Sequence, residues 1–253
     1  MLPVLIQIGP LKLFTYGLLA AIGLLTGVTL AARRAEKEGL DGGLIADLGF
    51  YVIIAAIVGS RLMYVLVEYP TFIADPLRIF KLWEGGLVFY GGFIACVPVV
   101  WWFINKHKLP FWKVADILAP YLALAHAIGR LGCLAAGCCY CRPTDSWIGV
   151  VFSNPAGLAP LGVPLYPTQI FDSLNEFTIF LILLAIRRHK KFDGQLMITW
   201  ITLYSLGRFI VEYFRGDPRG QFLGLSLSTS QGIAVIGFVC GLILLYRGFR
   251  KAK

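Results

Sequence analysis

Long apolar blocks alternate with short polar connections along this chain, and the alternation predicts its elements. Seven blocks are long enough for a transmembrane helix, which needs about 20 mostly apolar residues to cross about 30 Å of hydrocarbon. They lie at about 11–32, 45–67, 86–104, 114–131, 168–186, 195–214 and 228–246. The first block lacks the charged start and cleavage site of a signal peptide, so we interpret it as a retained helix. The pattern predicts an all-α polytopic membrane protein with one domain over residues 1–253.

Two connections are longer than the rest. Residues 68–85 contain an amphipathic run that includes Phe72, Ile73 and Leu77, which is typical of a helix lying in the membrane interface. Residues 132–167 are rich in Gly, Pro and Cys, and we expect them to form a small head with one short hairpin.

Composition supports this interpretation and excludes others. The chain is 58% hydrophobic and only 15% charged, whereas soluble domains carry about 25% charged residues. Its 14% aromatic content excludes intrinsic disorder. The net charge of +9 would suit a nucleic-acid-binding protein, but its distribution indicates topology instead.

The basic residues predict the orientation. Fourteen Lys and Arg residues fall in the segments after the first, third, fifth and seventh blocks, against seven on the opposite side. By the positive-inside rule the C-terminus is cytoplasmic and the N-terminus is outside. The segments 68–85 and 132–167 are then periplasmic. An odd number of helices agrees with this result, and we expect no nucleic-acid partner.

Ionisable residues at membrane depth are costly, and each is therefore a candidate for function. Here they gather toward the outer ends of the helices, and they are Arg61, Asp116, His126, Arg130, Arg208 and Glu212. Arg208 and Glu212 are four residues apart and share a helical face, with Arg215 just beyond. A guanidinium donates two parallel hydrogen bonds to a phosphate, so arginines here suit a phospholipid headgroup. The alternative is that they snorkel to the interface or pair with carboxylates such as Glu212.

Five motifs, spread in order over nearly the whole chain, carry a family resemblance. They are residues 83–92 (WEGGLVFYGG), 115–120 (ADILAP), 129–132 (GRLG), 166–169 (YPTQ) and 208–217 (RFIVEYFRGD), the last followed by 227–231 (LSTSQ). Together they resemble the bacterial prolipoprotein diacylglyceryl transferases, as does the predicted topology of seven helices with the N-terminus outside.

The resemblance implies an enzyme of the bacterial inner membrane with its active site toward the periplasm. It would transfer the diacylglyceryl group of phosphatidylglycerol to the lipobox cysteine of a prolipoprotein signal peptide, forming a thioether and releasing glycerol phosphate. Its partners would be these two substrates and membrane lipids. The resemblance implies catalytic roles for Arg130, Arg208, Tyr90 and Glu212. It implies phosphatidylglycerol binding by Arg130, Tyr16, Tyr204, Arg215 and Gly129.

The physical chemistry of the displacement is compatible with these residues. Fixed guanidinium groups stabilise the charge that develops on the departing phosphate. The thiol needs a base, and Tyr90, Glu212 and His126 are candidates. For His126 a hydrogen-bonded interior position is the alternative. The displacement requires no organic cofactor, and we expect no metal.

The chain departs from the family pattern at a cysteine-rich segment. Cys133, Cys138 and Cys141 stand where the family has asparagine, glutamate and glycine, and Tyr90 stands where many members have a histidine. With Cys139, four cysteines lie within nine residues, and packing, a disulfide, a zinc site and direct chemistry are all open interpretations. The C-x₄-C-C-x-C spacing is not a standard zinc motif. A non-catalytic or divergent lipid-binding or transport protein of the same fold is therefore the alternative function.

Overall fold

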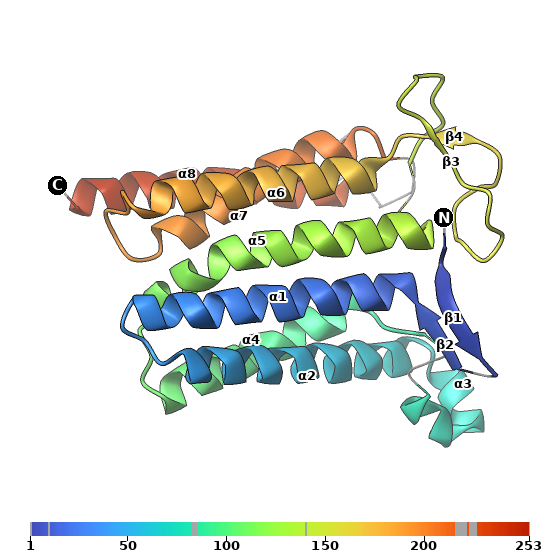
Figure 1. Cartoon of the computed structure of the whole chain (residues 1–253), viewed down its shortest axis with the longest axis horizontal. Coiled ribbons are helices and arrows are strands. Elements are labelled where there is room, and N and C mark those ends of the chain that lie inside the picture. Colours follow the sequence, from blue (N-terminus) through green and yellow to red (C-terminus); the bar gives the residue numbers. More distant parts are fainter. Residues whose placement is uncertain are drawn as a thin grey trace. The chain divides into compact units, whose positions relative to one another are not determined.

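The computed structural model describes residues 2–9, 11–81, 85–139, 141–215, 222 and 227–252, and most of them are helical (Figure 1). In chain order the elements are β1 (Val4–Ile8), β2 (Leu11–Phe14), α1 (Thr15–Lys37), α2 (Gly42–Val67), α3 (Tyr69–Ala74), η1 (Pro76–Phe80), α4 (Phe89–Lys106), α5 (Phe111–Ala136), β3 (Val150–Val151), β4 (Pro164–Leu165), α6 (Thr168–Arg187), α7 (Gln195–Glu212) and α8 (Thr229–Lys251). They form two compact units, Ala31–Val114 and the described parts of Met1–Leu30 with Ala115–Lys253. The expectation of one functional domain stays a prediction.

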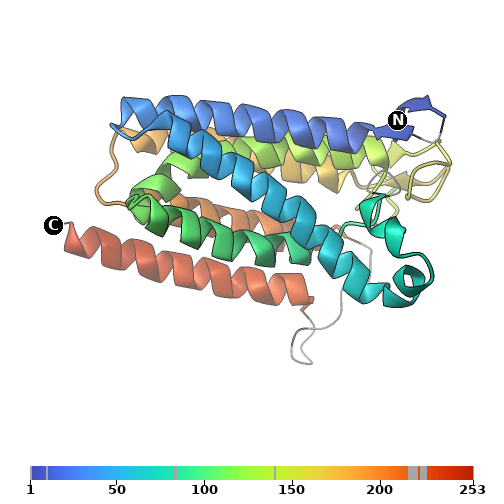
Figure 2. The same ribbon diagram turned by 90° about the horizontal axis from the view of Figure 1, so that it is seen from below.

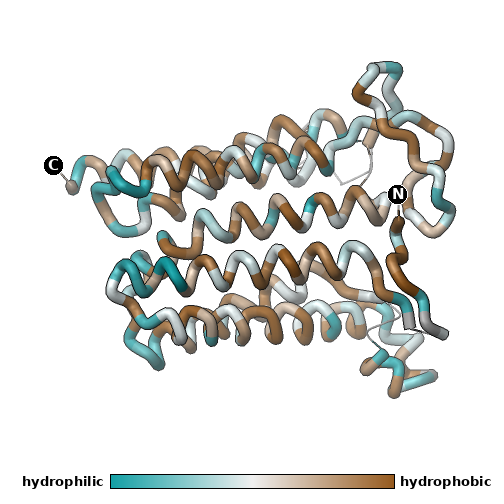
Figure 3. The backbone as a smooth tube through the Cα atoms, viewed as in Figure 1, coloured by the Kyte–Doolittle hydropathy of each residue, from teal (hydrophilic) through white to brown (hydrophobic). Residues whose placement is uncertain are grey.

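Five of the described helices, α1, α2, α5, α6 and α8, are long and apolar enough to cross a membrane. Figure 3 shows hydrophobic residues along these helices and hydrophilic ones gathered at many of their ends. Helices α4 and α7 are shorter, with 18 residues each; α4 ends in Asn105 and Lys106, and α7 carries Arg208 and Glu212. The chain is a multi-pass membrane protein.

The N-terminal segment corrects the expectation of an all-α fold and of a first helix from residue 11. Strands β1 and β2 pair antiparallel, and α1 begins only at Thr15. Gly9, with a φ of 58°, takes the left-handed conformation that reverses the chain between the strands. The Thr15 side chain then donates to the Leu2 carbonyl and fixes the start of the helix.

In the unit Ala31–Val114, α2 and α4 lie side by side (Figure 2). Their backbones approach closely at Gly59 and Gly91, where a Cβ on Gly59 would collide with the Gly91 carbonyl and with Ala95. Small residues at such a crossing are typical of helix packing in membranes, where close van der Waals contact drives association.

Arg61 organises the segment that follows α2. Its Nε donates to the Ile79 carbonyl (2.9 Å), Nη1 to those of Gly85 (2.6 Å) and Gly86 (3.1 Å), and Nη2 to those of Arg78 (2.5 Å) and Lys81 (3.3 Å). A guanidinium has five N–H donors, and all five are used here. The predicted interfacial segment 68–85 thus contains α3 and η1. The hydrogen bonds of one buried arginine, Arg61, fix its backbone.

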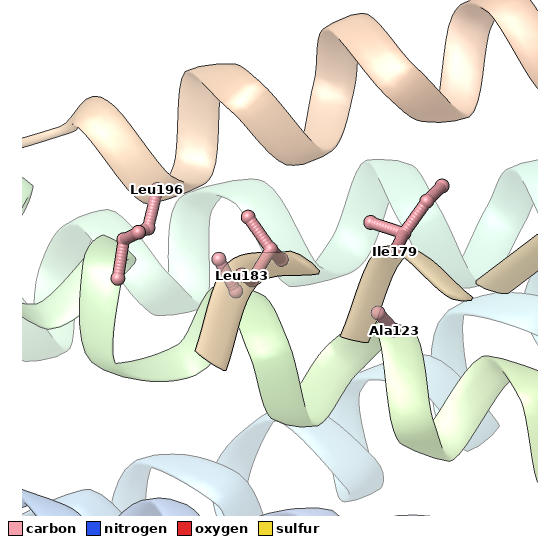
Figure 4. Packing of buried hydrophobic residues seen from close by; sticks show 5 residues of the cluster. Ala123, Ile179, Leu183 and Leu196 are labelled. Atoms are coloured by element: carbon pink, nitrogen blue, oxygen red, sulfur yellow. The ribbon is translucent and has the colours of Figure 1, made fainter. Parts of the chain in front are cut away.

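The core of the other unit lies between α5, α6 and α7. Ala123 of α5, Ile179 and Leu183 of α6, and Leu196 of α7 are buried against one another (Figure 4). The small alanine lets α6 approach α5, and this contact positions the polar side chains one or more turns further along the same helices.

Helix α7 begins on an acceptor supplied by α5. The Asp116 carboxylate accepts from the backbone N–H groups of Gly194 (2.7 Å), Leu196 (2.8 Å) and Met197 (3.1 Å). These are among the N–H groups that a helix start leaves without partners. Asp116 therefore caps the N-terminus of α7, although it belongs to α5. Lys190 Nζ lies 3.1 Å from the same carboxylate.

The predicted head is present with a short antiparallel pair of strands, but it begins later than the expected residue 132, because α5 continues to Ala136. Strands β3 and β4 pair antiparallel, and Phe152, Ala159 and Leu165 form a small core beneath them. The head is joined to the end of α7, because Cys141 and Arg215 form a backbone bridge and Arg142 Nε donates to the Arg215 carbonyl (2.9 Å).

Candidate active site

The arginine of the GRLG motif is paired with a carboxylate across two helices. Arg130 of α5 places Nη2 2.5 Å from Asp172 Oδ2 of α6, and both side chains are nearly buried. Nη1 of Arg130 donates to Cys133 Sγ one turn further along α5 (3.6 Å). The Nε of Arg130 is buried and makes no hydrogen bond to any described residue. This site therefore holds a fixed cation with a donor left for a further acceptor.

Tyr16 lies against the same end of α5. A Cβ on Gly132 would lie 3.2 Å from the Tyr16 Cα and 3.3 Å from its ring, so any larger residue would crowd this approach. Tyr16 interacts electrostatically with Arg130 and with three cysteines. Its side chain is about half exposed, which leaves the ring accessible to a lipid.

The second arginine is paired within its own helix, as the four-residue spacing predicts. Arg208 Nη2 lies 2.7 Å from Glu212 Oε2 and 3.5 Å from the Ser230 hydroxyl of α8. The Ser228 hydroxyl donates to Glu212 Oε1 (3.0 Å), and Ser228 also caps α8 in a capping box with Gln231. The start of α8 therefore fixes the carboxylate that holds Arg208.

Tyr204 lies within electrostatic range of both arginines. It interacts electrostatically with both Arg130 and Arg208, and its ring centroid lies 5.7 Å from that of His126. His126 Nδ1 in turn lies 3.3 Å from Glu176 of α6, whose other oxygen accepts from Trp200 Nε1 (3.1 Å). His126 thus belongs to a side-chain network with Glu176 next to a predicted substrate residue; its own side chain is 37% exposed, and its role stays a prediction.

Three of the cysteines converge at the end of α5. The sulfur atoms of Cys133, Cys138 and Cys139 all lie within 4.8 Å of one another, and no disulfide joins any two of them. A hydrogen bond with Cys133 raises the pKa of Cys138, which lies beyond the helix. Hydrogen bonds from Cys133 and Cys138 lower the pKa of Cys139 well below its usual range, although burial works against this.

The remaining predicted site residues occupy different surroundings. Arg215 is buried where α7 meets the head, and its carbonyl accepts from Arg142. Gly129 faces open space, since a Cβ there would meet no atom within 4 Å. Tyr90 lies in the first turn of α4, in the other unit, and is 67% exposed.

The sequence analysis missed the acidic partners on α6. Asp172 and Glu176 are four residues apart on an otherwise apolar helix, and the cost of burying a charge in a membrane points to both. They hold Arg130 and His126, which the sequence analysis did name.

The fold and the site together define a multi-pass helical membrane protein with arginine–carboxylate pairs buried between its helices. Comparison with known proteins identifies the family to which this membrane protein belongs. The family model for prolipoprotein diacylglyceryl transferase matches residues 3–247, and the chain belongs to this family.

Individual relatives match the sequence of this chain over most of their length. The chain is 39% identical to phosphatidylglycerol–prolipoprotein diacylglyceryl transferase 2 of Clostridium perfringens, over 95% of this chain and 93% of that protein. It is 36% identical to the phosphatidylglycerol–prolipoprotein diacylglyceryl transferase of Clostridium tetani, over 96% of each chain. The corresponding enzyme of Halalkalibacterium halodurans is 31% identical, over 99% of this chain and 86% of the relative.

Proposed function

We propose that this chain transfers the diacylglyceryl group of phosphatidylglycerol to the lipobox cysteine of a prolipoprotein. Family membership over nearly the whole chain supports the reaction. The observation that carries the assignment to a site is Arg130, whose guanidinium is fixed by Asp172 and keeps a buried Nε that bonds no described residue. A phosphate oxygen is the acceptor that such a donor suits.

In this proposal the lipobox sulfur bonds to the glycerol carbon that carries the phosphate. The carbon–oxygen bond to the phosphate breaks, and glycerol phosphate leaves with the electron pair on its oxygen. Arg130 and Arg208 stabilise that charge in a site of low dielectric constant, where fixed donors act most strongly. Tyr16, Tyr204, Arg215 and Gly129 contribute to phosphatidylglycerol binding, a role the first two suit because both interact electrostatically with Arg130.

The proton of the substrate thiol needs an acceptor. Glu212 is engaged by Arg208 and Ser228, which hold its side chain in a fixed place. Tyr90 is exposed and so accessible to a substrate. His126 is engaged with Glu176. We retain Tyr90 and Glu212 as catalytic residues in the proposal.

The proposed arrangement in the membrane has seven spans, with α4 and α7 added to the five apolar helices. Both pack against longer apolar helices, α4 against α2 and α7 against α6 and α8. The excess of Lys and Arg in alternate connections places the C-terminus in the cytoplasm and the N-terminus outside. The arginine pairs and the head then face the periplasmic side of the bacterial inner membrane.

The test uses purified full-length protein with phosphatidylglycerol vesicles and a lipobox peptide. We expect a lipidated peptide from the natural sequence, and Arg130→Ala and Arg208→Ala should each lower the rate by about 10²–10³-fold, the usual effect of removing one oxyanion donor. Arg188→Ala, which removes a charge at the opposite end of α6, is the matched control. Full activity in both site variants would refute the mechanism.

The cysteines at family asparagine, glutamate and glycine positions favour a second candidate, a relative that binds the lipid without transferring it. Its signature would be saturable phosphatidylglycerol binding that depends on Arg130, with no lipidated peptide. Expression in a strain depleted of its own transferase separates the two functions, because only an active transferase restores growth.

A further inference from the structure

The thiols of Cys133, Cys138 and Cys139 are arranged like ligands of one ion. Their sulfur atoms lie within 4.8 Å of one another. Around a tetrahedral zinc ion with Zn–S bonds of about 2.3 Å, neighbouring sulfurs are about 3.8 Å apart. Small side-chain rotations therefore bring the three sulfurs to three corners of one tetrahedron. Cys133 is buried, and the other two are half-buried.

The loop that carries two of these thiols is held in an uncommon conformation. Gly137 and Cys139 both have left-handed backbone, with φ of 64° and 57°. For cysteine this conformation is strained, and such strain gathers at functional sites. Gln169 donates to the Cys138 carbonyl (2.7 Å) and the Thr168 hydroxyl to the Cys139 carbonyl (3.4 Å). Both donors are fully buried, so the start of α6 fixes the loop.

The charges around the cluster also suit a metal. A divalent ion with three thiolates carries a net charge of −1, and a buried anion needs a partner. Arg130 is a neighbouring cation shared between this cluster and Asp172, since its Nη1 donates to Cys133 Sγ (3.6 Å) while its Nη2 lies 2.5 Å from the Asp172 carboxylate. A disulfide would join only two of the sulfurs and would leave the third thiol, and this donor, without a comparable role.

We propose that Cys133, Cys138 and Cys139 bind a thiophilic d¹⁰ cation, Zn²⁺, and that its fourth coordination position takes the lipobox thiol. The second half of this proposal rests on the proposed function. Catalytic zinc sites keep three protein ligands and one exchangeable position, and a thiol that coordinates zinc loses its proton. Zinc coordination would thus replace a general base in removing the proton of the lipobox thiol.

In the proposed reaction the lipobox thiol would bind zinc and release its proton to solvent. Its sulfur would form the bond to the glycerol carbon while the carbon–oxygen bond to phosphate breaks, and the electron pair would leave on the phosphate oxygen. Arg130 adjoins Cys133 and the proposed phosphate site, so one guanidinium would lie close to both the zinc ligands and the leaving group.

The metal is tested on full-length, reduced protein in detergent. Elemental analysis should find about one zinc per chain, and Co²⁺ as a spectroscopic probe should give the visible bands of a tetrahedral thiolate site. We expect Cys133→Ser and Cys138→Ser each to weaken binding about tenfold or more. Cys96→Ser and Cys240→Ser, in α4 and α8, are the matched controls and should bind as the natural sequence does.

Two results would overturn the metal site. One is a folded protein that binds neither ion while all three thiols react with an alkylating agent. The other is a pair of thiols that reacts only after reduction, in protein that takes up no metal once reduced, which would show a disulfide instead. Since two separate variants are used, a folding failure in one leaves the other to decide.

The substrate thiol is tested on the Co²⁺-loaded protein. A lipobox peptide should shift the visible bands, and the same peptide with serine for its cysteine should not. Transfer measured on the same preparation separates the two proposals. Zinc binding without any transfer would refute the proposed function and leave the metal site standing, whereas full transfer in metal-free protein would refute the role of zinc in activating the thiol.

Discussion

Arg130 on α5 and Asp172 on α6 form an ion pair 2.5 Å long between two helices that also share a buried apolar core. The aspartate does more than neutralise the arginine. It points the guanidinium, so that Nη1 reaches Cys133 and Nε remains without a partner among the described side chains. Asp172 is therefore a positioning residue for the proposed phosphate site.

We expect Asp172→Asn to lower the transfer rate by about 10–100-fold through misplacement of Arg130, the order of loss that a poorly oriented catalytic group causes. KM for phosphatidylglycerol should change less than kcat, because the arginine is still present. Kinetics over a range of lipid concentrations give both constants. Asp145→Asn, at an exposed position of the head, is the control for the loss of one carboxylate charge. A purely structural role would instead lower the yield of folded protein and leave the kcat of the remainder unchanged.

The substitution Tyr90→Phe tests whether the exposed hydroxyl on α4 takes part in catalysis. If that hydroxyl takes part in proton transfer, the rate should fall by about 10²-fold, the lower end of the range for general acid–base catalysis. The change removes a single oxygen from a side chain that is 67% exposed, so folding should be unaffected. Rates of lipidation of a lipobox peptide provide the measurement. An unaltered rate would remove Tyr90 from the catalytic set and would favour activation of the thiol elsewhere.

Arg61→Lys should release the segment that contains α3 and η1. Lysine has three donors in place of five and cannot reach all five carbonyls. Each buried carbonyl left without a partner costs about 1–3 kcal/mol. Limited proteolysis should then cut within residues 68–86 at a rate at least ten times that of the natural sequence. Arg78→Lys, which keeps the backbone carbonyl that Arg61 uses, is the control. Equal protection of Arg61→Lys and the natural sequence would show that the segment is held by other contacts.

The ion pairs of Lys190 should make the thermal stability of the folded protein depend on pH. Burial alone would lower its pKa, but hydrogen bonds to Asp193 and Asp116 outweigh this effect and raise it. A raised pKa means that the contribution is fully present below about pH 10.4, the ordinary lysine value, and is lost as the pH rises further. Lys190→Met should therefore lower the melting temperature at pH 7 but change it little above about pH 11.

The control for this prediction is Lys191→Met, which removes the adjacent charge and leaves Asp116 paired. Thermal unfolding in detergent at the two pH values gives the comparison. A constant difference between Lys190→Met and the natural sequence at both pH values would contradict the ion-pair explanation.

Much of the fold follows from hydropathy alone. The apolar blocks coincide with the long helices within a few residues, because in a membrane both length and composition are set by the hydrocarbon. The exception is the N-terminus, where Leu11–Phe14 is apolar enough for a helix but pairs with β1 after the turn at Gly9. Hydropathy does not distinguish these two structures over so short a stretch.

The candidate site was predictable in part. The Arg208–Glu212 pair follows from spacing on one helix, whereas the partner of Arg130 lies 42 residues away on another helix and depends on how α5 and α6 pack. The meeting of Cys133 with Cys138 and Cys139 depends on left-handed backbone at Gly137 and Cys139. Cysteine rarely adopts that conformation, so no sequence rule would have placed it there.

The carboxylate of Asp116 has a consequence for biosynthesis. Asp116 precedes Gly194 by 78 residues, so this acceptor is already made when α7 emerges from the ribosome. The first N–H groups of α7 are satisfied once the two helices dock. Docking of α7 against α5 is thus the step that seals the polar end of the later helix, and a chain without the Asp116 carboxylate would lack this acceptor.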